Sequence, residues 1–311
     1  MSFSLDLKRE LITRTDTAIH CKMAELGGII SINARFIKRE DTDPGEEIIS
    51  IRADSEELAG KISRLLYNVF EKQFAFDSIY VEQKKGYRII ISDPEVLELL
   101  KSRIKLMKND CYAEPGLTIT QHTCCKKAFL RGAFLAGGSV SSPEKAYQME
   151  IACTTENNAE RLLSILKALH LDARSIKRKN RYIVYIKDGD TISDFLGVTG
   201  GMNSMMEFEN IRILKDIRNS INREVNCDTA NINKVVNAAA KQIDDINLII
   251  EKRGLDSLPE QLREVARLRL MHPHLSLTEL GEKLDKPLGK SGVNHRLARI
   301  NEIAEKIRSN D

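Results

Sequence analysis

The sequence contains no tryptophan, few aromatic residues and no long apolar run. No stretch approaches the roughly 18 apolar residues that a membrane-spanning helix needs, and the amino-terminal MSFSLDLKRELITR lacks the apolar region of a secretion signal. We therefore expect a cytoplasmic protein with no membrane partner. The chain also lacks a large net charge, because its 48 basic and 45 acidic residues nearly balance. Any nucleic-acid surface must therefore come from local clusters of cations.

Paired cysteines of the CxxC type are absent as well. The six cysteines are Cys21, Cys111, Cys124, Cys125, Cys153 and Cys227. A chain of 311 residues needs no disulfide scaffold, so we expect reduced thiols. His122 lies close to Cys124 and Cys125, but the spacing matches no zinc template, and we expect neither a metal nor a cofactor.

Two regions of the chain repeat the same order of patterns. DSEELAGKISRLL at 54–66 resembles TTENNAERLLSIL at 154–166, and both have helical spacing of apolar residues. GYRIIISD at 86–93 resembles RYIVYIKD at 181–188, and both are typical of strands. The repeats predict two copies of a unit with the order helix, strand, strand, helix, strand, strand, helix.

The spacing places both copies within the first 200 residues. The first copy, within 1–110, is expected to contain Leu7–Leu26, Ser31–Glu40, Glu47–Arg52, Ser55–Phe70, Ser78–Gln83, Tyr87–Ser92 and Pro94–Leu106. The second, within 120–200, is expected to contain His122–Ala136, Gly138–Ser141, Tyr147–Cys153, Thr155–Leu169, Ala173–Lys179, Arg181–Lys187 and Gly189–Leu196. The sequence therefore predicts an α+β domain with pseudo-twofold symmetry.

A pair of glycines ends the first helical pattern of each copy, in AELGGII at 24–30 and FLAGGSV at 134–140. Glycine at a helix end can adopt the left-handed conformation that terminates the helix. Small residues also let two helix backbones approach closely. Both roles remain open, and the second predicts that the two helices pack side by side.

The stretch FLRGAFLAGGSV at 129–140 resembles the signature helix of LAGLIDADG homing endonucleases. The resemblance implies two αββαββα halves, with the signature helices at their interface and two antiparallel sheets forming a saddle for DNA. In that family each signature helix ends in an acidic residue that binds the metal ions for DNA cleavage. Here the matching positions are expected at Gly27 and Gly137. Because glycine offers no metal ligand, we expect a relative that has lost endonuclease activity.

A basic hairpin is expected in the second copy, at 173–187. The cations of this stretch are Arg174, Lys177, Arg178, Lys179, Arg181 and Lys187, of which the first five are the expected DNA contacts, and it contains no acidic residue. A β-ribbon with clustered cations can follow a phosphate backbone. The alternative is a hairpin tip that is merely solvated.

The segment 201–255 is expected to be a helical connector. Ile232, Val235, Val236 and Ala239 have helical spacing, and the segment as a whole predicts a pair of helices. Gly254 ends the pattern.

The segment 256–311 predicts a helix-turn-helix domain. A first helix follows Pro259, a capping box of Ser276 and Glu279 begins a short second helix, and Ser291 is expected to cap a third. The inner face of the third helix is predicted to contain Val293, Leu297, Ile300 and Ala304.

The third helix has the composition of a recognition helix. Its expected DNA-binding residues are Lys290, Ser291, Asn294, His295, Arg296 and Arg299. Between Lys286 and Ile300 there are four cations and no acid. Arginine and asparagine suit bidentate contacts with base edges in the major groove. A three-helix bundle that binds no DNA is the alternative.

The stretches LTELGEKL and GKSGVNHRLARI resemble the carboxy-terminal signature of the WhiA family, which joins such a domain to a LAGLIDADG-like domain without catalytic acids. The resemblance implies a bacterial, nucleoid-associated protein that binds double-stranded DNA. It also implies roles in transcription, cell division, chromosome segregation or sporulation. The alternative is a scaffold that holds another regulatory or division protein and binds DNA without sequence specificity. An active metal-dependent endonuclease is disfavoured by the two glycines.

Overall fold

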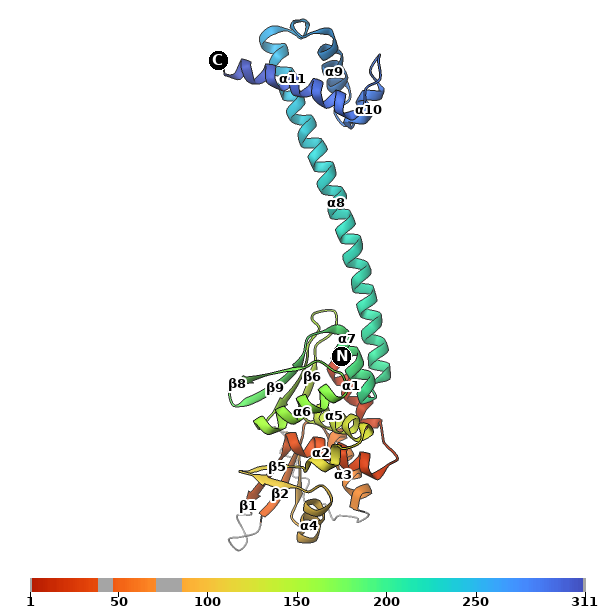
Figure 1. Ribbon diagram of the computed structural model, residues 1–311, viewed down its shortest axis with the longest axis vertical. Coiled ribbons are helices and arrows are strands. Elements are labelled where there is room, and N and C mark those ends of the chain that lie inside the picture. The colour runs from red at the N-terminus through yellow and green to blue at the C-terminus, as the bar shows by residue number, and fades with distance from the viewer. Residues whose placement is uncertain (1, 39–46, 71–85, 310–311) are drawn as a thin grey trace. The chain divides into compact units, whose positions relative to one another are not determined.

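The computed structural model describes residues 2–38, 47–70 and 86–309, and Figure 1 shows the order of its helices and strands. The chain divides into two compact units, Met1–Lys215 and Asp216–Asp311. Within the described ranges, no helix combines the length and apolar character needed to cross a membrane.

The first unit begins with two helices where the sequence predicted one. The expected helix Leu7–Leu26 is wrong, because α1 ends at Thr13 and α2 begins at Ile19. The break contains Thr15, Asp16 and Thr17, whose side chains compete with helical hydrogen bonding. The first half contains α1 (Phe3–Thr13), α2 (Ile19–Asn33), β1 (Ala34–Lys38), β2 (Glu47–Ala53), α3 (Glu56–Phe70), β3 (Tyr87–Ile91) and α4 (Pro94–Arg103). The strand expected at Ser78–Gln83 lies outside the described residues.

A short hairpin that the sequence did not predict follows the first half. It consists of β4 (Met107–Asn109) and β5 (Tyr112–Glu114), and the 3-10 turn η1 (Leu117–Thr120) comes next. Strand β5 pairs with β1, so the hairpin extends the first sheet.

The second half agrees with its predicted order and, within a few residues, with its predicted bounds. It contains α5 (Thr123–Gly137), β6 (Gly138–Val140), β7 (Met149–Cys153), α6 (Glu156–Ala168), β8 (Arg174–Arg178), β9 (Arg181–Ile186) and α7 (Gly189–Thr199). The bounds of this half are predictable because each of its helices begins and ends close to the point where the spacing of apolar residues changes between the helical and the strand period.

Each half contributes one antiparallel sheet, which confirms the predicted α+β fold class. The orders are β3-β2-β1-β5-β4 and β6-β7-β9-β8. Successive side chains of a strand point to opposite faces, and β2 follows this rule. Ile49 and Ile51 belong to the buried core, whereas Ser50 lies between them on the other face of the sheet. Each sheet therefore has one face in the core and one open face.

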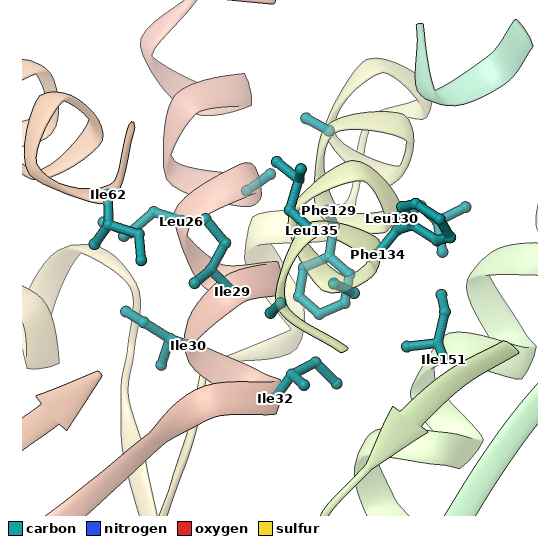
Figure 2. Packing of buried hydrophobic residues seen from close by; sticks show 14 of the residues in the cluster. Leu26, Ile29, Ile30, Ile32, Ile62, Phe129, Leu130, Phe134, Leu135 and Ile151 are labelled. Carbon is teal, nitrogen blue, oxygen red and sulfur yellow. The ribbon is translucent and has the colours of Figure 1, made fainter. Parts of the chain in front are cut away.

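Helices α2 and α5 pack against each other at the centre of the first unit (Figure 2). The two helices are equal in length, and 104 residues separate equivalent positions. A Cβ atom on Gly28 would lie 2.2 Å from the carbonyl oxygen of Phe129, and one on Gly132 would lie 2.0 Å from that of Glu25. These reciprocal contacts confirm the close packing of the two helices. The sequence did not indicate that Gly132 is one of the glycines at this helix contact.

The first glycine pair does not end a helix. Gly27 and Gly28 lie inside α2, which continues to Asn33, so the predicted helix end at Leu26 is wrong. In the second copy the prediction is confirmed, because Gly137 is the last residue of α5. The residue that follows, Gly138, has a φ of -85°, so the chain leaves the helix in extended rather than left-handed conformation.

A buried charge network joins α2, α3 and α5. The guanidinium of Arg131 donates two hydrogen bonds of 3.0 Å to the carboxylate of Glu25 and pairs with Asp16 as well. The ammonium of Lys61 lies 2.8 Å from the same Glu25 carboxylate. Burial lowers the pKa of Lys61, and the charge of Glu25 offsets part of this effect. For Arg131 burial acts in the same direction, but hydrogen bonds and charge from Glu25 and Asp16 outweigh it and raise the pKa.

One long helix replaces the predicted pair in the connector. Helix α8 spans Met202–Arg253, 52 residues without a break, because no proline or glycine interrupts it before Gly254. The carboxylate of Glu10 caps its amino end by accepting hydrogen bonds from the backbone N–H groups of Asn203 and Ser204 at 2.8 and 2.9 Å.

The second unit contains the predicted succession of helices. The turn η2 (Leu255–Ser257) leads into α9 (Glu260–Met271), α10 (Leu277–Glu282) and α11 (Lys290–Arg308). Their apolar faces form one core with Ile246 and Ile249 of α8. The buried carboxylate of Asp245 accepts hydrogen bonds from Asn301 at 2.7 Å and Arg308 at 2.8 Å, which ties α8 to α11.

Candidate nucleic-acid interface

Helix α11 is held in place by its predicted inner face. Val293, Leu297, Ile300 and Ala304 are all buried, which confirms the prediction. The capping box at the start of α10 is also confirmed. The hydroxyl of Ser276 accepts from the backbone N–H of Glu279 at 3.3 Å, and the Glu279 carboxylate accepts from the backbone N–H of Ser276 at 2.8 Å.

The cap of α11 is not the predicted one. Gly289 is the N-cap, and because glycine has no side chain, this end of the helix has no side-chain cap. Lys290 is therefore the first helical residue and Ser291 the second, so the prediction that Ser291 caps the helix is wrong. Its side chain is exposed at the amino end of the helix, where backbone N–H groups and the helix dipole favour an anion.

Five of the six predicted side chains of α11 are exposed. They are Lys290, Ser291, Asn294, His295 and Arg299. None of these five makes a side-chain hydrogen bond or ion pair with another described residue. Ser291, His295 and Arg299 follow one another at intervals of four residues, so they form one row along the helix. Lys290 and Asn294 form the adjacent row.

Arg296 differs from the other five because it faces α9. Its guanidinium lies 3.7 Å from the Glu264 carboxylate and donates a hydrogen bond of 3.3 Å to the backbone carbonyl of Gln261. Only 18% of its side chain is exposed, so its contacts in this structure hold α11 against α9.

A hollow of about 260 Å³ extends the surface beside Lys290 and Asn294. Its other lining residues include Thr278 of α10 and Lys234 of α8. The sequence reasoning missed both as site residues. The signal for Thr278 was its position in the first turn of the predicted second helix, which contacts the DNA backbone in helix-turn-helix proteins.

The basic hairpin is present, but its cations do not share one face. Arg178 is directly opposite Arg181, and Arg174 is directly opposite Tyr185, so these three arginines lie on the open face of the sheet. Lys177 is opposite Tyr182 on the other face, with its ammonium 5.2 Å from the centre of that ring. Lys179 lies in the turn with a φ of 54°. All five predicted cations are exposed.

The open face of the first sheet carries arginines as well. Arg35 of β1 is directly opposite Ser50 of β2, and Arg52 of β2 is directly opposite Arg88 of β3. The Arg35 guanidinium lies over the ring of Tyr112, 5.1 Å from its centre. The sequence reasoning did not name these cations as site residues, because an isolated arginine in an alternating strand gives no cluster along the chain.

A cleft of about 420 Å³ lies where the two open faces meet. Its charged lining residues are Lys8, Arg35, Arg52, Asp54, Arg88 and Arg181. Asp54 is the single carboxylate among the described lining residues, and it pairs with Arg52 at 3.3 Å. Burial lowers the pKa of Lys8, and the charge of Asp54 partly offsets this effect. The cleft therefore suits an anion.

The carboxyl ends of α2 and α5 open onto this cleft, which corrects one predicted position. The terminal residues are Asn33 and Gly137, so Asn33 and not Gly27 is the structural equivalent of Gly137. The Asn33 amide donates to the carbonyls of Ala136 at 3.0 Å and Arg52 at 3.1 Å. A Cβ atom on Gly27 would instead meet the side chain of Ile119 in the core.

Comparison with known proteins finds two kinds of domain in the chain. The profile of the WhiA C-terminal HTH domain matches residues 221–304, and that of the WhiA LAGLIDADG-like domain matches residues 126–218. The probable cell division protein WhiA of Lachnospira eligens is 42% identical over 314 residues, with 99% of this chain and 98% of that protein covered. Its counterpart in Lachnoclostridium phytofermentans is 40% identical over 319 residues, and the match covers 99% of this chain and 100% of that protein. Full-length WhiA from Thermatoga maritima, solved by crystallography, is 30% identical with a TM-score of 0.58 and covers 98% of this chain and 99% of its own.

Proposed function

Since the chain belongs to the WhiA family, we propose that it is a sequence-specific DNA-binding regulator that acts in bacterial transcription and cell division and does not cleave DNA. The relatives' name, probable cell division protein, supports the cellular role. Double-stranded DNA is the partner, and the nucleoid in the cytoplasm is the site of action.

The two rows of exposed residues on α11 are the observation that carries this proposal. Asn294 and Arg299 are the side chains best suited to bidentate hydrogen bonds with adenine and guanine, and both project from a helix of the size that the major groove admits. The absence of acidic residues from Lys290 to Ile300 removes charge repulsion with phosphates.

The saddle of two sheets adds contacts with the phosphate backbone. Arginines from both open faces line or flank the cleft, and arginine binds phosphate in bidentate geometry. Cleavage by the two-metal mechanism needs several ligands around two cations about 4 Å apart. Asn33, Gly137 and the single Asp54 do not supply them.

Selection from a random pool of DNA duplexes tests the proposal. We expect the full chain to enrich one sequence, and we expect Arg299→Ala to lose part of that preference, about 1–3 kcal/mol for a bidentate contact. Lys306→Ala is the matched control, because it removes an exposed cation farther along the same helix. The same duplex incubated with Mg²⁺ is expected to remain intact.

Two results would overturn parts of this proposal. Cleavage of the duplex would refute the loss of endonuclease activity. Binding with a steep salt dependence but no enriched sequence would leave phosphate contacts only. The chain would then be the interaction scaffold, and a regulatory or division protein would be its specific partner.

A further inference from the structure

Four potential metal ligands meet at the amino ends of α2 and α5. They are His20, Cys21, Cys124 and Cys125. Their ligand atoms all lie within 4.8 Å of one another. His122, which the sequence reasoning considered with Cys124 and Cys125, is not among them; its ring packs against that of His20 with centroids 5.7 Å apart.

The pseudo-twofold symmetry of the first unit explains how the cluster arises. Helix α2 begins at Ile19 and α5 at Thr123, so His20 and Cys124 are equivalent second residues and Cys21 and Cys125 equivalent third residues. Two ordinary dipeptides, separated by 104 residues in the sequence, become one group of four ligands. The close packing of the two helices fixes their spacing before any ligand binds.

The distances match a tetrahedral site. The Nδ1 atom of His20 lies 3.1 Å from the Sγ atom of Cys125, 3.4 Å from that of Cys21 and 4.0 Å from that of Cys124. Bond lengths of about 2.3 Å to sulfur and 2.0 Å to nitrogen place those atoms about 3.5 Å apart around a tetrahedral zinc ion. The three distances lie on either side of this value.

We propose that His20, Cys21, Cys124 and Cys125 bind one Zn²⁺ ion that joins the two halves of the first unit. Three thiolates and one imidazole form one of the common ligand sets of structural zinc sites. Soft sulfur ligands disfavour Mg²⁺ and Ca²⁺, which take oxygen. All four positions are filled by side chains, so the site leaves no position for a catalytic water and its role is structural.

The surroundings compensate the charge of the site. Zn²⁺ with three thiolates carries one net negative charge, and the bound thiols release their protons. The amino ends of two helices, each with partial positive charge, converge on it. Neither helix has a side-chain cap that satisfies its first backbone N–H groups. In α2 the N–H group of Cys21 donates to the carbonyl oxygen of Ala18 at 3.1 Å, which leaves the N–H groups of Ile19 and His20 available to the sulfur atoms.

Metal content of the full chain is the first test. Protein purified under reducing conditions without a chelator is expected to contain about one zinc ion per chain by elemental analysis. The double variant Cys124→Ser/Cys125→Ser is expected to contain none. Cys111→Ser/Cys227→Ser is the matched control, because it removes two exposed cysteines that lie outside the cluster. A wild-type chain with no more zinc than the cluster variant would overturn the proposal.

A second test does not depend on variants that fold poorly. Wild-type chain stripped of metal and titrated with Co²⁺ is expected to develop the visible absorption of tetrahedral cobalt with thiolate ligands, and added Zn²⁺ is expected to abolish it. His20→Cys is expected to keep the site with four sulfur ligands. His20→Ala is expected to weaken binding by more than about 100-fold, which exceeds the cost of changes outside the ligand shell. Octahedral cobalt spectra would refute the site.

Stability gives a readout of the structural role. Saturating Zn²⁺ is expected to raise the Tm for thermal unfolding of the first unit by on the order of 10 °C. This is the shift expected for a ligand present at about 1,000 times its Kd. The Cys111→Ser/Cys227→Ser control is expected to respond equally. If alkylation and mass spectrometry find two of Cys21, Cys124 and Cys125 joined by a disulfide in freshly purified protein that holds no zinc, the cluster is an oxidation site and the proposal fails.

Discussion

Helices α5 and α11 use their polar residues in opposite ways. Of the 15 residues of α5, ten are buried, and they include the charged Arg131. Of the 19 residues of α11, five are buried, all of them apolar, and the predicted DNA-binding side chains other than Arg296 are exposed. The first helix is therefore an interior element that holds two halves together, whereas the second presents its side chains to a partner. Substitutions in α5 should change stability, and exposed substitutions in α11 should change binding.

The largest expected effect comes from the point where α5 meets α2. Gly132→Ala places a methyl group 2.0 Å from the carbonyl oxygen of Glu25, so the helices must separate, and we expect a loss of more than about 4 kcal/mol in the free energy of unfolding. Gly60→Ala is the control, since its Cβ meets nothing within 4 Å and a helical alanine is favoured by about 1 kcal/mol. Calorimetry of the full chain measures both. Equal Tm values for the two variants would contradict the close packing.

The next effect comes from the buried charge on α5. Arg131→Met leaves the Glu25 carboxylate with Lys61 as its remaining close cation, and breaking such a buried pair costs about 3–5 kcal/mol. Urea unfolding measures the change. Arg178→Met, at an exposed position of β8, is expected to stay within about 0.5 kcal/mol of the original chain. A small change for both variants would mean that the network adds little to stability.

On α11 the expected effect is on recognition alone. Asn294→Ala is expected to relax base preference at one position of the bound site by about 1–3 kcal/mol, because the amide is exposed and has no described partner in the protein. Its Tm should match that of the original chain. Competition between duplexes that differ at single base pairs measures the preference. A uniform loss across all duplexes would instead assign Asn294 to the phosphate backbone.

The smallest effect is expected on the sheet, where contacts are with phosphates. Replacing Arg174, Arg178 and Arg181 by alanine should make the plot of log affinity against log salt concentration shallower by about 3 units, and the preferred sequence should not change. Lys177→Ala is the control, because its side chain lies on the opposite face. Fluorescence anisotropy across a salt series distinguishes the two. An equal response of Lys177→Ala would place the DNA elsewhere.

The sequence predicted most of the fold because local patterns carried it. The capping box at Ser276 and the apolar row from Val293 to Ala304 are local signals, and both are confirmed. The misses concern positions that depend on distant partners. Asn33 shares the cleft with Gly137 only because two helices pack in register, and no local pattern reveals that register.

The site residues show the same distinction. The predicted DNA-binding residues of α11 lie within about three consecutive turns of the helix, and all of them except Arg296 are exposed. The arginines of the first sheet are scattered along the chain and converge only through strand pairing. The cysteine–histidine cluster is the extreme case, since each dipeptide alone has no metal-binding spacing.

The separation of α2 and α5 along the chain has a consequence for synthesis. Ribosomes add about 5–20 residues per second, so α2 waits about 5–20 seconds for the partner that is made 104 residues later. Ten of its 15 residues are buried in the folded unit, and until α5 emerges the face of α2 that packs against α5 has no native cover. We therefore expect the nascent first half to expose this apolar face to chaperones, and we expect the second unit, whose helices are neighbours in sequence, to fold soon after it leaves the ribosome.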